Sequence, residues 1–126
     1  MTEALVEDDF ELFGSSKPDG QDTTASEWQQ TEGVFSTFEH ETNGLVHVGV
    51  GGLMNGITTT ALDPLFWLHR SNIDRIWVMW NARGHRNPTD PLWLDMTLRD
   101  FVTSDGTPYG LRVRDLQDTS ALGYRY

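Results

Sequence analysis

The chain has 126 residues, of which 37% are hydrophobic, and 19 acidic residues against nine basic ones give it a formal net charge of -10. This charge repels phosphate backbones and anionic lipid, and no stretch reaches the roughly 18 apolar residues of a membrane span, so we expect neither nucleic-acid nor membrane binding. The absence of cysteine excludes disulfides, thiolate metal ligands and thiol nucleophiles.

The first 33 residues are acidic and polar, and we interpret them as a loop-rich N-terminal segment of a single domain. Glycine, serine and proline at residues 14–20 are typical of a loop between two short segments. Met1 is followed by Thr2 and Glu3 rather than by a basic and then an apolar stretch. We therefore expect a soluble chain without a signal peptide, and the compartment stays open.

The first predicted helix covers residues 35–50. Its apolar residues are Phe35, Phe38, Leu45 and Val46, and Gly44 inside it costs roughly 1 kcal/mol relative to alanine. The acidic residues at positions 39 and 41 are interpreted as a solvated face. Three glycines at positions 49, 51 and 52 end this helix, and a loop rich in glycine and threonine follows to residue 62.

A second helix is predicted from Pro64 to about Arg83. Asp63 is a good N-cap, and proline suits the first helical position because no N–H partner is needed there. Apolar residues occur on nearly every face, which predicts a helix central to the core. One stripe along it carries Leu65, His69, Ile73, Ile76 and Trp80, and a neighbouring stripe carries Phe66, Arg70, Asp74, Trp77 and Asn81.

After this helix the sequence predicts a short segment over residues 93–101 and a turn at residues 105–108, before a closing Leu-Gly-Tyr-Arg-Tyr. No internal repeat or low-complexity tract interrupts this order. The fold class predicted is therefore mainly α, with long loops.

Two long motifs carry a family resemblance. The motif of the second helix starts Asp-Pro-x-Phe at Asp63 and ends Asp-Arg-x-Trp at Trp77, and residues 38–54 combine a Glu-rich lead-in with a Val-Gly-Gly-x-Met ending. With the closing Tyr-x-Tyr, these stretches resemble the second copper-binding half (CuB) of the tyrosinase, catechol oxidase and haemocyanin family. The resemblance covers residues 34–126 and implies half of a four-helix bundle. The family's first half would add three more histidines, and residues 1–33 contain none.

The resemblance implies three ligand positions for this copper, and only one of them holds histidine. The first position falls on Asn43, the second on His47 and the third on Arg70. Arginine keeps its charge and has no lone pair for a metal. The sequence therefore argues against a normal copper centre. If copper binds, His47 is the candidate ligand, followed by the neighbouring His69.

Other polar residues also have structural interpretations. Arg70 and Asp74 lie four residues apart on the helix and are predicted to form an ion pair, although Arg70 is also a candidate anchor for an anion or substrate. His40 lies two turns, about 10 Å, from His47, which is too far to share one ion. His85 is expected in a solvated basic corner. Three tryptophans of the long helix are interpreted as packing residues, namely Trp67, Trp77 and Trp80.

Three functions stay open. The first is a tyrosinase-like protein whose degenerate copper pocket is lined by Asn43, His47 and Arg70. The second is half of a polyphenol or catechol oxidoreductase that needs a first-half chain or a second copy, with a phenolic small molecule as substrate. The third is different chemistry such as ester hydrolysis, with His47 or His69 as base and Arg70 stabilising the oxyanion. A half-bundle exposes an apolar face, so we expect a homo-oligomer or a missing first-half partner.

Overall fold

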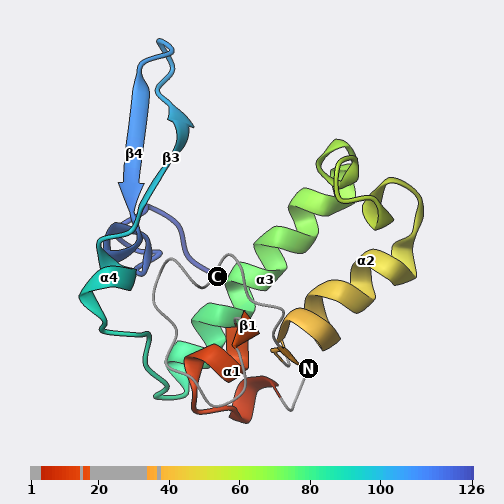
Figure 1. Cartoon of the computed structure of the whole chain (residues 1–126), viewed down its shortest axis with the longest axis horizontal. Coiled ribbons are helices and arrows are strands. Elements are labelled where there is room, and N and C mark those ends of the chain that lie inside the picture. Colours follow the sequence, from red (N-terminus) through yellow and green to blue (C-terminus); the bar gives the residue numbers. More distant parts are fainter. Residues whose placement is uncertain (1–3, 15, 18–33, 37) are drawn as a thin grey trace.

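The computed structural model describes residues 4–14, 16–17, 34–36 and 38–126 of the chain (Figure 1). The predicted mainly helical fold is confirmed. The α-helices are α1 (Phe10–Gly14), α2 (Leu45–Val50), α3 (Pro64–Ala82) and α4 (Pro91–Leu94). The shorter helical turns are η1 (Ala4–Val6), the π-helical η2 (Phe38–Gly44), η3 (Gly52–Asn55), η4 (Thr60–Leu62) and η5 (Val113–Leu116). Two antiparallel pairs complete the fold, formed by β1 (Ser16–Lys17) with β2 (Val34–Phe35) and by β3 (Thr97–Val102) with β4 (Pro108–Arg112).

Helix α3 begins and ends close to where the sequence predicts. The Asp63 side chain accepts a hydrogen bond from the Leu65 backbone N–H at 2.9 Å, and Pro64 takes the first helical position. After the last turn Gly84 adopts a φ of 98°, a left-handed conformation that favours glycine. The buried residues of α3 lie on the predicted apolar stripe, and they are His69, Ile76 and Trp80.

The core lies against the C-terminal half of α3, where α1 crosses it (Figure 1). Trp80 has no exposed surface and stacks on Phe13 with ring centroids 4.6 Å apart, and Phe13 stacks in turn on Phe38 at 4.8 Å. The Trp80 Nε1–H donates to the Glu7 carbonyl at 2.6 Å, so the one polar atom of the indole is satisfied. The segment before residue 15 thus completes the core around α3.

The helix predicted over residues 35–50 begins later than expected, and its first part is a π-helix. Phe35 lies in β2, and a π-helical turn occupies η2 before α2 begins at Leu45. A π turn is wider than an α turn, because its hydrogen bonds join residues five apart. A Cβ on Gly44 would lie 3.2 Å from the Glu39 carbonyl oxygen, five residues earlier, so the small residue suits this turn.

His85 does not lie in a solvated corner, which corrects the sequence-based expectation. Its ring stacks on Trp80 with centroids 4.8 Å apart, and its side chain is 13% exposed. Its Nδ1 lies 2.9 Å from the Asp8 carboxylate and its Nε2 lies 3.2 Å from the Leu5 carbonyl. Asp8 and Leu5 lie near the N-terminus, far from His85 in the chain, so local composition around residue 85 did not indicate them.

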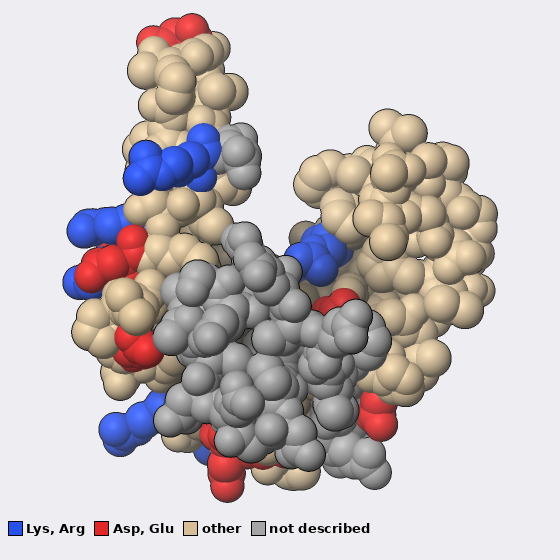
Figure 2. Space-filling model, viewed as in Figure 1, with Lys and Arg blue, Asp and Glu red and all other residues tan. Residues whose placement is uncertain are grey.

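Residues 44–69 form a lobe almost without charge, in which Asp63 is the single Asp, Glu, Lys or Arg. Figure 2 shows this neutral lobe as the tan region on the right of the molecule. Trp67 is 61% exposed here, so its interpretation as a packing residue is wrong, whereas Trp80 is buried. The exposed apolar residues of the neutral lobe are Leu45, Val46, Val48, Val50, Leu53, Ile57, Leu62, Leu65, Trp67 and Leu68. Within the described residues no helix is both long and apolar enough to cross a membrane.

Asp74 on α3 holds the C-terminal segment. Its carboxylate accepts hydrogen bonds from the Tyr124 hydroxyl at 2.7 Å and the Tyr126 hydroxyl at 2.6 Å. These contacts hold the pKa of each tyrosine at about 12, through the hydrogen bond first for Tyr124 and through burial and the hydrogen bond for Tyr126. The predicted Arg70–Asp74 ion pair is not present among the described residues, because the carboxylate faces the tyrosines instead.

We expect Asp74→Asn to loosen this attachment. An amide oxygen accepts weaker hydrogen bonds than a carboxylate, so the free energy of unfolding in urea should fall by about 1 kcal/mol. Alkaline titration of tyrosinate absorbance should also move the Tyr124 and Tyr126 pKa values from about 12 toward 10. In a Tyr124→Phe/Tyr126→Phe background the same substitution should have little further effect. An equal loss of stability in both backgrounds would contradict this role.

Candidate functional site

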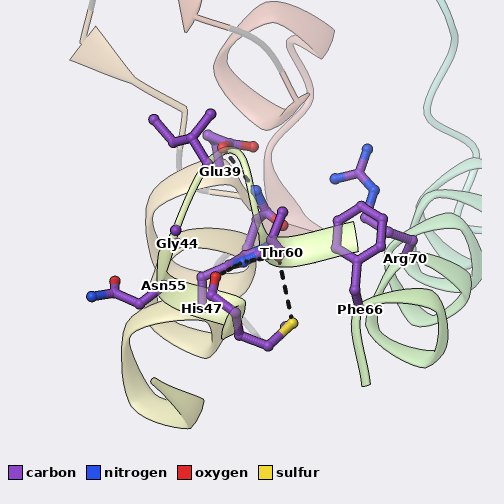
Figure 3. Close-up of a pocket in the computed structure, with 11 residues that line it drawn as sticks. Glu39, Gly44, His47, Asn55, Thr60, Phe66 and Arg70 are labelled. Carbon is purple, nitrogen blue, oxygen red and sulfur yellow. Dashed lines mark hydrogen bonds between the residues drawn. The ribbon is translucent and has the colours of Figure 1, made fainter. Parts of the chain in front are cut away.

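A pocket of about 350 Å³ opens between η2, α2, the η3–η4 segment and the start of α3 (Figure 3). Three of the predicted pocket residues line it, namely Asn43, His47 and Arg70, while His69 is buried behind Asn43 and Asp74 faces the C-terminal tyrosines. The full lining consists of Glu39, Asn43, Gly44, His47, Met54, Asn55, Gly56, Ile57, Thr60, Phe66 and Arg70.

A chain of hydrogen bonds joins α3 to η2 beside the pocket. The His69 Nε2 lies 2.9 Å from the Asn43 Oδ1, and the Asn43 Nδ2 donates to the Glu39 carboxylate at 2.8 Å. A carboxylate only accepts, so the amide nitrogen faces Glu39 and the amide oxygen faces His69. His69 is therefore the donor through its Nε2–H. Glu39, expected on a solvated face, is half-buried as part of this chain.

His69 is held in its neutral form. Burial lowers the pKa of its ring below the ordinary 6.5, and electrostatic interaction with the neighbouring His47 ring and the Arg70 guanidinium lowers it further, while Glu39 acts in the opposite direction. A neutral imidazole has one N–H, and Asn43 accepts it. His69 thus acts as a buried donor within the network.

His47 lines the pocket, and its Nδ1 is committed to hydrogen bonds. Its Nδ1 lies 2.7 Å from the Met54 carbonyl, which only accepts, so Nδ1 carries the proton. Thr60 Oγ1 lies 3.2 Å from the same Nδ1, which therefore has no lone pair to take the hydroxyl proton. Among the described residues Nε2 has no hydrogen-bond partner. This geometry does not favour a Thr60–His47 nucleophile and base.

Arg70 lies at the edge of the pocket beside an aromatic ring. Its guanidinium carbon is 6.0 Å from the Phe66 ring centroid, within the range of a cation–π contact (Figure 3). In the described part of the chain no carboxylate lies within ion-pair distance of it. Arg70 therefore gives the pocket a permanent positive charge that no carboxylate of the described residues pairs with.

The residues at the predicted ligand positions do not supply three imidazoles. Asn43 uses its side-chain oxygen for His69, and Arg70 is a cation without a lone pair. Only His47 offers a ring nitrogen to the pocket. The structure brings no group of three His, Asp or Glu side chains together as a metal-binding site within the residues it describes. This donor set does not fit a copper ion held by three histidines.

Sequence reasoning missed several residues of the pocket. Met54 and Phe66 belonged to the motifs but carried no predicted role at a site, and Thr60 lay in the loop. The spacing of four between Glu39 and Asn43 is a signal that could have paired them, because such residues are neighbours on a helix. No comparable signal links Thr60 to His47, since their contact depends on how the loop returns.

Comparison with known proteins gives one consistent family. The family model described as the common central domain of tyrosinase matches residues 4–83. Tyrosinase HcTyr1 from Hahella sp. (strain CCB-MM4) is 39% identical over 95 residues, which is 75% of this chain and 20% of that protein. Polyphenol oxidase C, chloroplastic, from Solanum lycopersicum is 38% identical over 84 residues, which is 61% of this chain and 13% of that protein.

A solved structure agrees with these relatives. Latent apple tyrosinase has 26% sequence identity and a TM-score of 0.72, with 98% of this chain and 28% of that chain covered. The chain thus spans about a fifth or less of the length of the curated relatives it matches. The family match begins at residue 4, and the predicted division at residue 34 stays a prediction.

We expect His69 to make stability depend on pH. Its folded-state pKa lies below 6.5, so between the two values the unfolded chain binds more protons. Its contribution is therefore complete above about pH 6.5 and is lost as the pH falls through the folded-state pKa. A glutamine side chain at this position would keep an N–H donor toward Asn43 without titrating. In urea unfolding, the stability advantage of the wild type over His69→Gln should shrink from about pH 7.5 to about pH 5. A constant difference would contradict the assignment.

Proposed function

The chain belongs to the tyrosinase family, and we propose that it is a member in which a hydrogen-bonded pocket for a small organic molecule takes the place of the second copper site. In this proposal the chain does not oxidise phenols or catechols by itself. One observation carries the proposal. At the first predicted ligand position the Asn43 side chain is hydrogen-bonded to His69, and at the third position Arg70 is a cation.

Copper would have to overcome three features of this pocket. Binding through the Asn43 oxygen competes with its bond to His69, and loss of that bond would leave a buried N–H unpaired at a cost of about 1–3 kcal/mol. The Arg70 guanidinium repels a divalent cation. His47 then remains as a single imidazole, and one such ligand does not give the affinity of a three-histidine site. These features support the proposal independently of one another.

Copper titration by calorimetry tests the proposal. We expect no tight stoichiometric binding by the wild-type chain and binding of one Cu²⁺ per chain by Asn43→His/Arg70→His, because the double variant restores three imidazoles. Adding His47→Ala to the double variant should weaken binding at least about ten-fold, since it removes one ligand. Tight stoichiometric binding by the wild type would overturn the proposal.

A second candidate function is an oxidoreductase half that becomes active with a partner chain. The neutral lobe favours it, because ten exposed apolar residues lie in a region with a single charged side chain. The match to this chain covers a fifth or less of the relatives named tyrosinase and polyphenol oxidase. The partner would be a separate first half or a second copy, and its substrate a phenol or catechol.

Self-association tests the partner surface. We expect the mass from light scattering to rise with concentration for the wild type and to stay monomeric for Leu68→Asp, because the substitution places a charge in the neutral lobe. Val102→Asp on the β3–β4 hairpin is the matched control, since Val102 is 67% and Leu68 69% exposed. Equal effects of the two variants would reject the lobe as the interface.

The same preparation separates the two candidate functions. Oxygen consumption with catechol and added copper, in a wild-type chain shown to be dimeric, should not exceed that of buffer under the first proposal. A rate well above buffer would support the oxidoreductase half. The absence of such a rate in a proven dimer would reject a homodimeric oxidase.

A further inference from the structure

The pocket combines a positive charge with an apolar wall. Arg70 lies beside Phe66, and the cation–π contact holds the guanidinium at the pocket edge (Figure 3). Met54 is buried in the wall, whereas Ile57 is 97% exposed although it lines the pocket. A ligand with an apolar body would therefore cover surface that the chain itself leaves in water.

The charges around the pocket limit the charge of such a ligand. The planar guanidinium fork matches a carboxylate, which it binds through two parallel hydrogen bonds. Glu39 lies on the other side of the Asn43 amide, and the chain as a whole carries a formal charge of -10. Both repel a second negative charge, so a monoanion is favoured over a divalent anion such as phosphate.

From these features we infer that the pocket binds an organic monocarboxylate with a compact apolar body. The carboxylate pairs with Arg70, and the apolar body covers Phe66 and Ile57. The Nδ1 of His47 is already committed to the Met54 carbonyl, so it is not available to bind a second anionic group. This inference rests on the proposed function, since it assigns the ligand class of the same pocket.

Binding of cyclohexanecarboxylate, followed by amide chemical shifts in the presence of EDTA, tests the inference. The open pocket and small probe predict a dissociation constant on the order of 1 mM, with shifts centred on residues 54–57 and 66–70. Cyclohexanecarboxamide has the same body without the charge and should bind at least about ten-fold more weakly. Inorganic phosphate at the same concentration should not displace the carboxylate.

Three variants separate the charge effects. Arg70→Gln should weaken binding at least about ten-fold, because it removes a charge-assisted pair. Arg99→Gln makes the same change in net charge on the hairpin, outside the pocket, and should leave binding unchanged. Glu39→Gln keeps the oxygen that accepts from Asn43 while it removes the repelling charge, so it should strengthen binding about two- to five-fold.

The outcomes decide between specific binding and general charge attraction. Equal weakening by Arg70→Gln and Arg99→Gln, or equal affinity for the carboxylate and the amide, would overturn the inference. If Arg70→Gln did not fold, Arg70→Lys supplies the test, with several-fold weakening expected because lysine lacks the planar fork. EDTA removes copper from this experiment, so a failure here leaves the calorimetric test of the proposed function unaffected.

Discussion

The hydrogen bond between His69 and Asn43 determines the geometry of the site, since it joins α3 to the π-helical turn across 26 residues of chain. Further contacts fix the orientation of both residues. Asn43 is oriented by Glu39, and burial keeps the His69 ring neutral, so that its one N–H is directed at the amide oxygen. Separating the two elements would leave a buried donor unpaired, at a cost of about 1–3 kcal/mol.

That bond also decides what the pocket offers to a ligand. Successive residues of a helix point about 100° apart, so the turn of α3 that buries His69 directs Arg70 toward the pocket edge. Besides two amides and the Thr60 hydroxyl, the polar side chains that line the pocket are therefore the Arg70 guanidinium, the Glu39 carboxylate and the His47 ring. A site with this set binds by charge and shape, and its histidine network is internal to the fold.

The parts of this fold that could be predicted from the sequence are those with local causes. Helix α3 has its N-cap and its first-turn proline side by side, and the family motif placed Asn43, His47 and Arg70 around one site. The π turn escaped prediction because its hydrogen bonding differs from that of an α-helix by one residue, which no apolar period reveals. The surroundings of His85 and Asp74 were predicted wrongly because their partners are distant in the chain. Leu5 lies 80 residues from His85, and Tyr124 lies 50 residues from Asp74.

The residues that pack the core and the residues at the pocket occupy different parts of α3. Stacking on Trp80 fixes the C-terminal half, and Asp74 holds the last residues of the chain, whereas His69 and Arg70 lie one turn or more earlier. The main packing contacts of the fold therefore lie apart from the residues at the predicted ligand positions. The neutral lobe has little core of its own, so in that part of the molecule the His69–Asn43 bond is an important link between α3 and η2.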